Sequence, residues 1–374
     1  MTQSNRNNAK QLAICKRFAS SGLTLLLTII IINKVAAQSQ QTAPVTIKQA
    51  VQEAVERNLS LLAERYNLSV ADARISAARL RPNPVLSLYS DLLDLAGTGF
   101  NAQNTAGPPE YGIRTDFILE GGRKRRYRVE VAEQQKAVAQ WQLLNTVRAL
   151  ALDVQNAFVE TLLAKETLAL AEQNLESFHR MVEVSEERVR VGDLAQVELT
   201  RTQLAELQFN NAVIQGRSRL RIAKQRLQLL MGRATPSELF DVAGEMRSGP
   251  LPFNFEELWR QALNQRPDYQ AMLRDQARSV AEIRSQIAQG KVDYTVGTEF
   301  RRQQGIAGTG NSLGFFFSAP LPLFNRNQGE IARAREERQQ VEARTRALEV
   351  GMRNELDAAW SQYETARSLL AHIE

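Results

Sequence analysis

The stretch ERVRVGDLAQVELTRTQ, residues 187–203, contains a single glycine between two long segments suited to helices. Residues 123–191 include neither Gly nor Pro over 69 positions, and a helix of that length measures about 100 Å at 1.5 Å per residue. Gly192 supplies the left-handed conformation that commonly ends a helix. We therefore predict a long helix over 123–191, a reversal at Gly192, and a return helix over 193–231.

The two helices are predicted to pack as an antiparallel coiled coil. Asp193 is expected to cap the return helix, with Gln196 as its capping-box partner. In the outgoing helix, mostly apolar side chains recur every seven residues, which is typical of a coiled-coil seam; they are Val147, Val154, Thr161, Leu168, Leu175, Val182 and Val189. The companion positions are mostly small, as at Ala157 and Ala164, and this favours close packing of the returning helix.

The sequence contains an internal duplication. The segment that begins at Ile47 aligns with the segment that begins at Phe255, and both read as a helix, a break and a strand. Repeat one is predicted over 45–232 and repeat two over 255–374, with a Pro- and Gly-containing linker over 233–254. Each repeat contains a helix, two short strands and a long helix, which in repeat two is expected over 329–374. The predicted fold is therefore mainly α with β, with an internal duplication.

The four short segments alternate polar and apolar residues, and this period of two indicates strands wetted on one side. Strands of 9–11 residues can also cross a bilayer when tilted. An ordinary half-buried hairpin is the alternative. The predicted strands cover 84–93, 111–119, 292–301 and 312–320. The charged residues on their polar sides, predicted to face water inside a barrel, are Arg114, Asp116, Asp293 and Glu299.

Four strands cannot close a membrane barrel, because known single-chain barrels begin at about eight strands. Strand edges exposed to lipid are not viable, since their backbone groups lack partners. If these strands enter a membrane, several copies of the chain must pool them, so we expect an oligomer.

Residues 1–37 have the pattern of an export signal. A basic segment leads into the apolar run Leu23–Ile32, and small residues precede Gln38. The apolar run is too short to span a bilayer, which needs about 20 residues; a retained N-terminal anchor is the alternative. The only cysteine, Cys15, lies before this run, so no disulfide is expected in the mature chain.

The charge balance argues against a nucleic-acid partner. Five of the 47 Lys and Arg residues lie in residues 1–37, which contain no acid, so the remaining 42 cations face 41 acids. Such a nearly neutral chain offers little attraction for phosphate backbones. A local basic run is instead predicted to form a collar that reaches phospholipid headgroups at the membrane interface; it consists of Arg123, Lys124, Arg125 and Arg126.

No enzyme, cofactor or metal site is predicted. The GNSLG motif at 310–314 matches a nucleophile elbow, but Ser312 leads into an alternating strand, and the motif requires a helix and a later catalytic histidine. His179 and His372 are the only histidines and have no clustered partner in the sequence, so an imidazole metal site is not expected.

With these motifs, the chain resembles the outer-membrane efflux protein family, the TolC-like ducts of tripartite pumps. The segments LEGGRKRR (119–126), RVRVGDLAQVE (188–198) and APLPLFNRNQGEIARA (319–334) carry the resemblance, together with the duplicated element order. Two of them, EGGRKR and PLPLFNRNQG, are most similar to the branch that serves heavy-metal pumps of the cobalt–zinc–cadmium type.

The resemblance implies a homotrimer whose twelve strands form a transmembrane barrel in the outer membrane, continued by a helical tunnel through the periplasm. It implies a periplasmic adaptor and an energised inner-membrane transporter of the RND type as partners, and export of heavy-metal cations. The residues implied to contact the adaptor at the hairpin tip are Arg188, Val189, Val191, Gly192 and Asp193.

One departure from the family pattern concerns repeat two. Glu374 corresponds to about Glu172 of repeat one, which continues for some 60 residues through its tip and return helix. A truncated product is therefore expected. The alternatives are a drug or secretion duct of the same family and, from another class, a soluble periplasmic coiled-coil scaffold or adaptor.

Overall fold

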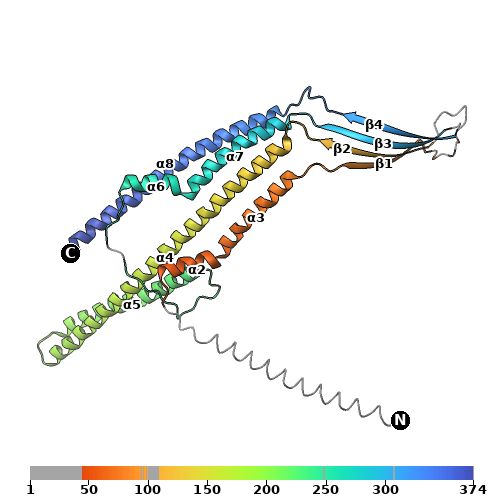
Figure 1. Ribbon diagram of the computed structural model, residues 1–374. Coiled ribbons are helices and arrows are strands. Elements are labelled where there is room, and N and C mark those ends of the chain that lie inside the picture. Colours follow the sequence, from red (N-terminus) through yellow and green to blue (C-terminus); the bar gives the residue numbers. More distant parts are fainter. Residues whose placement is uncertain are drawn as a thin grey trace, which may run out of the picture. The chain divides into compact units, whose positions relative to one another are not determined.

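The computed structural model describes residues 44–93, 95, 97, 99, 109–246, 249–305 and 308–373, and the predicted signal peptide lies outside these residues. Figure 1 shows the described helices and strands. In chain order they are α2 (Ile47–Arg57), α3 (Leu59–Arg79), β1 (Val85–Asp91), β2 (Glu110–Leu119), α4 (Lys124–Arg190), α5 (Gln196–Leu230), α6 (Phe255–Gln265), α7 (Pro267–Gln289), β3 (Tyr294–Gly305), β4 (Gly308–Ser318) and α8 (Gln328–Ile373).

The order of two helices, two strands and one long helix occurs twice, from α2 to α4 and from α6 to α8. The sequence predicts one leading helix in each repeat, and the structure has two. In the first repeat, the Asn58 side chain accepts from the amides of Ser60 and Leu61 at 3.0 and 3.1 Å and so caps a new helix. In the second, Pro267 occupies the first turn of α7, where its missing N–H costs nothing.

The chain forms two compact units. The first combines the described residues up to Ala54 with Val154–Met246, and it contains the C-terminal part of α4 and all of α5. The second combines Val55–Asp153 with the described residues after Arg247, and it contains the sheet. Within the part of the chain that the structure describes, no helix combines the length and apolar character that a membrane span needs.

In the first unit, α4 and α5 pack antiparallel along the predicted seam. Ion pairs join Glu160 to Arg226 and Glu172 to Arg217, each at 2.9 Å, so the two helices run in opposite directions. Close packing follows from small residues, since a Cβ added to Gly216 would lie 3.1 Å from the Leu168 side chain. The buried seam residues include Val154, Ala157, Thr161 and Val182 of α4 and Leu199, Val213, Ala223 and Leu227 of α5.

In the second unit, the four strands form one antiparallel sheet in the order β1-β2-β3-β4. The register places Arg114 of β2 opposite Ser87 of β1 and Glu299 of β3. Strands β1 and β4 are the edges of this sheet. A mainly helical chain with one four-stranded sheet agrees with the predicted fold class.

The strand ends differ from those predicted, most clearly in repeat two. The ladder between β3 and β4 continues to the pair Gly305 and Gly308, whereas the sequence predicts strand ends at 301 and 312. The intervening residues lack apolar alternation, but a ladder of main-chain hydrogen bonds does not require it. In repeat one, β1 ends at Asp91. Leu92, which belongs to the predicted strand 84–93, has a φ of 55° and lies outside the strand.

Candidate functional site: a two-faced sheet and a helical hairpin tip

One face of the sheet is apolar and open to solvent. Leu88, Phe315 and Phe317 are 70–77% exposed, although an antiparallel sheet of a soluble domain normally buries its apolar face. The register places further exposed apolar residues on the same face, namely Leu86, Tyr111, Ile113, Phe117, Leu119, Tyr294, Val296, Phe300 and Leu313. A continuous exposed surface of this kind indicates contact with lipid or protein.

The opposite face is polar, and its charges are packed together. Glu299 is only 5% exposed. Its Oε1 accepts from the Tyr89 hydroxyl at 2.6 Å and from Nε and Nη2 of Arg301 at 3.0 and 2.9 Å. Glu299 is among the residues that the sequence predicts for the lumen, whereas Tyr89 and Arg301 are not. The spacing of Arg301 two residues after Glu299 could have found one of them, because such residues share a strand face.

Arg114 and Asp116 lie on this same polar face. Nε of Arg114 donates to both carboxylate oxygens of Asp116 at 2.9–3.0 Å, and its guanidinium lies 4.3 Å from the centre of the Phe316 ring. Phe316 breaks the apolar alternation of β4, and this contact accounts for its position among charges. Gly297 leaves room for the cluster, since a Cβ there would lie 2.2 Å from Asp116 Oδ1.

Asp293 and Lys124 do not lie where the sequence analysis places them. Asp293 precedes β3, so it is not a strand residue. Its carboxylate accepts from Lys124 Nζ at 2.7 Å and from the Gly121 amide at 2.9 Å. Lys124 is 6% exposed, so its ammonium does not reach outward as part of a collar. The pair joins the start of α4 to the start of β3, a contact between repeats that a local pattern cannot reveal.

The hairpin tip is a Schellman motif. Gly192 has a φ of +83°, its amide donates to the Val189 carbonyl at 3.0 Å, and the Asp193 amide donates to the Arg188 carbonyl at 2.8 Å. The predicted capping box is wrong, because α5 begins at Gln196 with Ala195 as N-cap and no side-chain cap bond. Asp193 instead accepts from Arg188 Nε at 2.9 Å. Val191 is exposed beside them.

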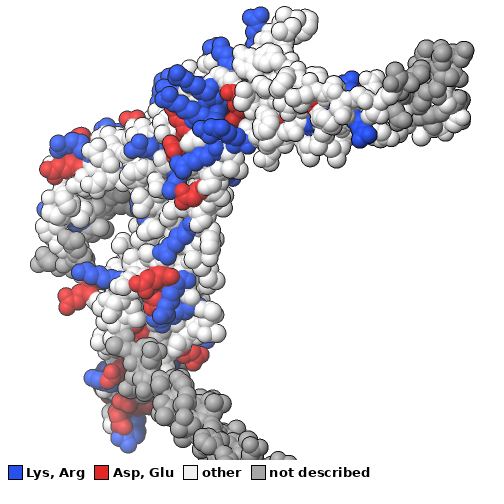
Figure 2. Space-filling view, turned by 45° about the vertical axis from the view of Figure 1, so that its right-hand side comes forward, with Lys and Arg blue, Asp and Glu red and all other residues white. Residues whose placement is uncertain are grey.

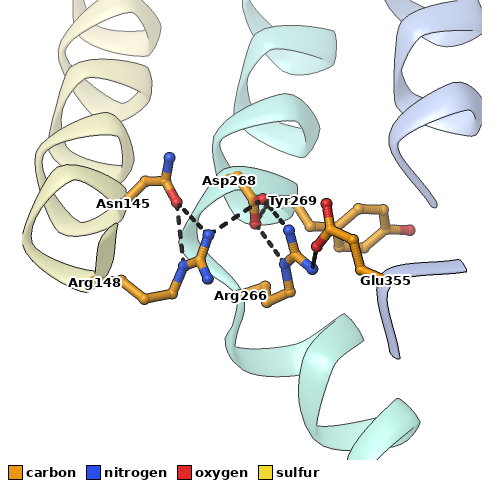
Figure 3. Close-up of polar contacts among 6 residues, drawn as sticks. All are labelled: Asn145, Arg148, Arg266, Asp268, Tyr269 and Glu355. Carbon is orange, nitrogen blue, oxygen red and sulfur yellow. Dashed lines mark hydrogen bonds and ion pairs between the residues drawn. The ribbon is translucent and has the colours of Figure 1, made fainter. Parts of the chain in front are cut away.

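A second polar cluster, which the sequence analysis misses, lies in the sheet-containing unit (Figure 3). Arg266 donates to both oxygens of Asp268 at 3.0 and 2.6 Å, and to Glu355 at 2.7 Å. Arg148 lies 3.7 Å from the same aspartate. Burial raises the pKa of Asp268, but the hydrogen bond and charge of Arg266 outweigh it, so the pKa is lowered overall. The cluster ties α4, α7 and α8 together within this unit.

His179 is engaged in a hydrogen bond between the two helices of the hairpin. His179 Nδ1 lies 2.7 Å from Glu206 Oε1 across the helical hairpin, and this hydrogen bond raises the pKa of His179. Among the described residues, no group of three or more His, Cys, Asp or Glu side chains could hold a metal ion.

A long antiparallel helical hairpin, together with a sheet that packs its charges and exposes its apolar face, defines a membrane-associated β-structure with a helical extension. The family model described as outer membrane efflux protein matches residues 50–233, about half of the chain. The chain belongs to the outer membrane efflux protein family, as its motifs predict, and is an outer-membrane protein.

Known proteins are similar over most of the chain. The cobalt-zinc-cadmium resistance protein CzcC of Cupriavidus metallidurans is 24% identical over 338 residues, which cover 88% of this chain and 75% of CzcC. The outer membrane efflux protein BepC of Brucella suis is 22% identical over 365 residues, 96% of this chain and 76% of BepC. The crystal structure of CusC gives a TM-score of 0.69 at 18% identity, and covers 87% of this chain and 77% of CusC.

Proposed function

We propose that the chain is the outer-membrane channel of a tripartite efflux pump and passes heavy-metal cations passively from the periplasm to the exterior. The observation that supports this most directly is the reversed polarity of the sheet, in which Glu299 is 5% exposed while Phe315 is 77% exposed. Such a sheet suits a wall with lipid on one side and water on the other.

Closure of that wall requires other copies of the chain. The sheet has two open edges, β1 and β4, and unpaired edges are not tolerated in lipid. Three copies supply twelve strands, an even number within the range of outer-membrane barrels. We therefore propose a homotrimer in which β4 of each copy pairs with β1 of the next. In this assembly the polar sheet face, which carries Arg114, Asp116 and Glu299, lines the lumen.

The charge of the polar face suits a cationic cargo. Within the strands, the register assigns four carboxylates to this face, from Asp91, Glu110, Asp116 and Glu299, but only two guanidiniums, from Arg114 and Arg301. Acidic rings favour cations in channels. The likeness to CzcC, a cobalt-zinc-cadmium resistance protein by name, agrees with a metal cargo.

The hairpin tip is proposed to contact a periplasmic adaptor, which connects the channel to an energised inner-membrane transporter of the RND type. Arg188, Val189, Val191, Gly192 and Asp193 form this surface. Except for the half-buried Val189, they are exposed. No catalysis and no cofactor are needed in this role, since the transporter supplies the energy and the channel supplies a path.

Conductance of the purified protein in planar bilayers tests the proposal. Under a KCl gradient, we expect a reversal potential that indicates preference for cations. The double variant Asp116→Asn/Glu299→Gln is expected to reduce this preference several-fold, because it removes two of the four carboxylates on the polar face of each subunit and brings the net charge of that face from −2 to zero. Each new amide keeps one oxygen that accepts hydrogen bonds. Glu336→Gln, an exposed change on α8, is the control and should leave the preference unchanged.

Two results would contradict the proposal. Absence of conductance, with recovery of the protein as a water-soluble species that Sarkosyl extracts, would favour the periplasmic scaffold. Conductance without any gain in cobalt, zinc or cadmium tolerance in cells that carry the pump partners, but with a gain in drug tolerance, would favour a drug duct of the same family.

A further inference from the structure

A pocket of about 430 Å³ lies where the sheet meets the helices, within the second unit. One part of its lining is apolar and comes from Pro82, Ile118 and Leu119. The rest is dominated by cations, namely Arg81, Arg123, Lys124, Arg125 and Arg126, with Glu120 as the single acid. Figure 2 shows Lys and Arg side chains gathered at this end of the sheet.

The arginines of this pocket carry uncompensated charge. Lys124 is paired with Asp293, and Glu120 is paired with Arg128 at 2.7 Å. In contrast, Arg81, Arg123, Arg125 and Arg126 are exposed, and among the described residues none of their guanidinium groups has an ion-pair or hydrogen-bond partner. Four free guanidiniums around one pocket repel one another, so an anion between them is favourable.

The internal duplication shows that the fold does not require these charges. Arg123, directly before α4, has a φ of 59°, and Asn327, directly before α8, has a φ of 64°. Asparagine tolerates this left-handed conformation better than arginine does. The next residues are Lys124, Arg125 and Arg126 in repeat one but Gln, Gly and Glu at 328–330 in repeat two. A residue with positive φ therefore precedes the long helix in repeat two without a basic cluster after it, and we infer that repeat one retains an unfavourable Arg123 for another reason.

We propose that this pocket binds the phosphate of an anionic phospholipid in the inner leaflet of the outer membrane. Guanidinium groups suit phosphate because they donate two parallel hydrogen bonds. The apolar lining from Pro82 and from Leu119, which lies on the apolar face of the sheet, suits the start of an acyl chain. The assignment rests on the proposed barrel, because only a membrane-inserted sheet brings its helical end to the headgroups. The proposed lipid site shares Arg123, Arg125 and Arg126 with the predicted basic collar. It does not use Lys124, and it includes Arg81.

The test measures lipid retained by the full chain. The protein is reconstituted into nanodiscs of phosphatidylcholine with a minor fraction of phosphatidylglycerol and then transferred to detergent, and bound lipid is counted by native mass spectrometry. We expect the wild type to retain phosphatidylglycerol preferentially. The variant Arg81→Gln/Arg123→Asn/Arg125→Gln should lose the preference by about fivefold for each arginine removed. Asparagine is chosen at 123 because Asn327 already occupies the matching turn.

Two further variants control for charge and for folding. Arg335→Gln/Arg344→Gln removes two exposed arginines of α8, which have no side-chain partner among the described residues, and should retain the preference. Arg81→Lys/Arg123→Lys/Arg125→Lys keeps the charge and should retain part of it. Equal retention of phosphatidylglycerol by all variants would overturn the lipid site, as would its displacement by millimolar inorganic phosphate, which would indicate a free-anion site. Failure of every variant to enter nanodiscs would instead contradict the proposed channel.

Discussion

Arg188 and Asp193 are joined twice across the hairpin tip. The Arg188 side chain donates to the Asp193 carboxylate at 2.9 Å, and the Asp193 amide donates to the Arg188 carbonyl at 2.8 Å. Only the main-chain bond belongs to the Schellman motif that Gly192 makes possible. The shape of the tip thus depends on a backbone conformation, while the side-chain pair lies on its surface.

Gly192→Val is expected to destabilise the tip, because a β-branched residue is strained at a φ of +83°. The left-handed conformation costs an L-residue roughly 1–2 kcal/mol. We predict a lower melting temperature by circular dichroism and weaker capture of the adaptor. Gly192→Asn is the matched control, since asparagine tolerates this conformation. Equal adaptor capture by the valine variant and the wild type would contradict the role of the tip.

The Arg188–Asp193 ion pair is expected to contribute little to stability. Its side chains are 53% and 64% exposed, and exposed pairs contribute about 1 kcal/mol or less. A double-mutant cycle with Arg188→Gln and Asp193→Asn should therefore give a small coupling energy in urea unfolding. Adaptor affinity should fall by a larger factor than this coupling explains. If affinity changes only as much as stability does, these side chains do not contact the adaptor.

Arg266→Gln is expected to cost about 3 kcal/mol of unfolding free energy, because it leaves the largely buried Asp268 carboxylate without its bidentate partner. Glu355, whose side chain is 66% exposed, remains hydrated and adds little to this cost. The side chains of Arg266 and Asp268 are less than one fifth exposed. Urea unfolding measures the change, with Arg335→Gln, a substitution of an exposed residue of α8, as control. A loss no larger than that of the control would show that the cluster is solvated in the assembly.

Asp268 makes the same cluster sensitive to acid. Its pKa is lowered in the folded chain, so its stabilising contribution is present above the unfolded value and is lost as pH falls through the folded value. We predict that the free energy of unfolding of Asp268→Asn falls less steeply as the pH is lowered than that of the wild type. Parallel acid limbs for the variant and the wild type would assign acid sensitivity to other carboxylates.

The stabilising contribution of His179 depends on pH in the opposite direction from that of Asp268. Glu206 raises its pKa, so the pair stabilises the hairpin fully below the ordinary histidine value and the contribution is lost as pH rises through the raised folded value. Melting temperatures measured across neutral pH should therefore converge for the wild type and His179→Gln at the alkaline end. A difference that grows with pH would contradict this assignment.

The sequence predicts the parts of the molecule whose patterns are local. Heptad spacing and the isolated Gly192 locate the hairpin, and alternation identifies four strands and their apolar face. Contacts that cross between repeats are not predictable in this way. Lys124 binds Asp293, and Tyr89 binds Glu299, only because the sheet order places β1, β2 and β3 side by side. The capping box fails for a local reason, since the Schellman turn carries Asp193 toward Arg188 before α5 begins.

The reversed sheet has a consequence for biogenesis. In a single exported chain, the apolar sheet face that contains Leu88, Phe315 and Phe317 is exposed. The edge strands β1 and β4 are also unpaired, and unpaired edges can add strands from other proteins. In the proposed trimer, these liabilities disappear only when three chains meet and enter lipid together. We therefore expect that a periplasmic chaperone must bind the chain before it assembles. We also expect that chains which do not assemble into trimers are degraded.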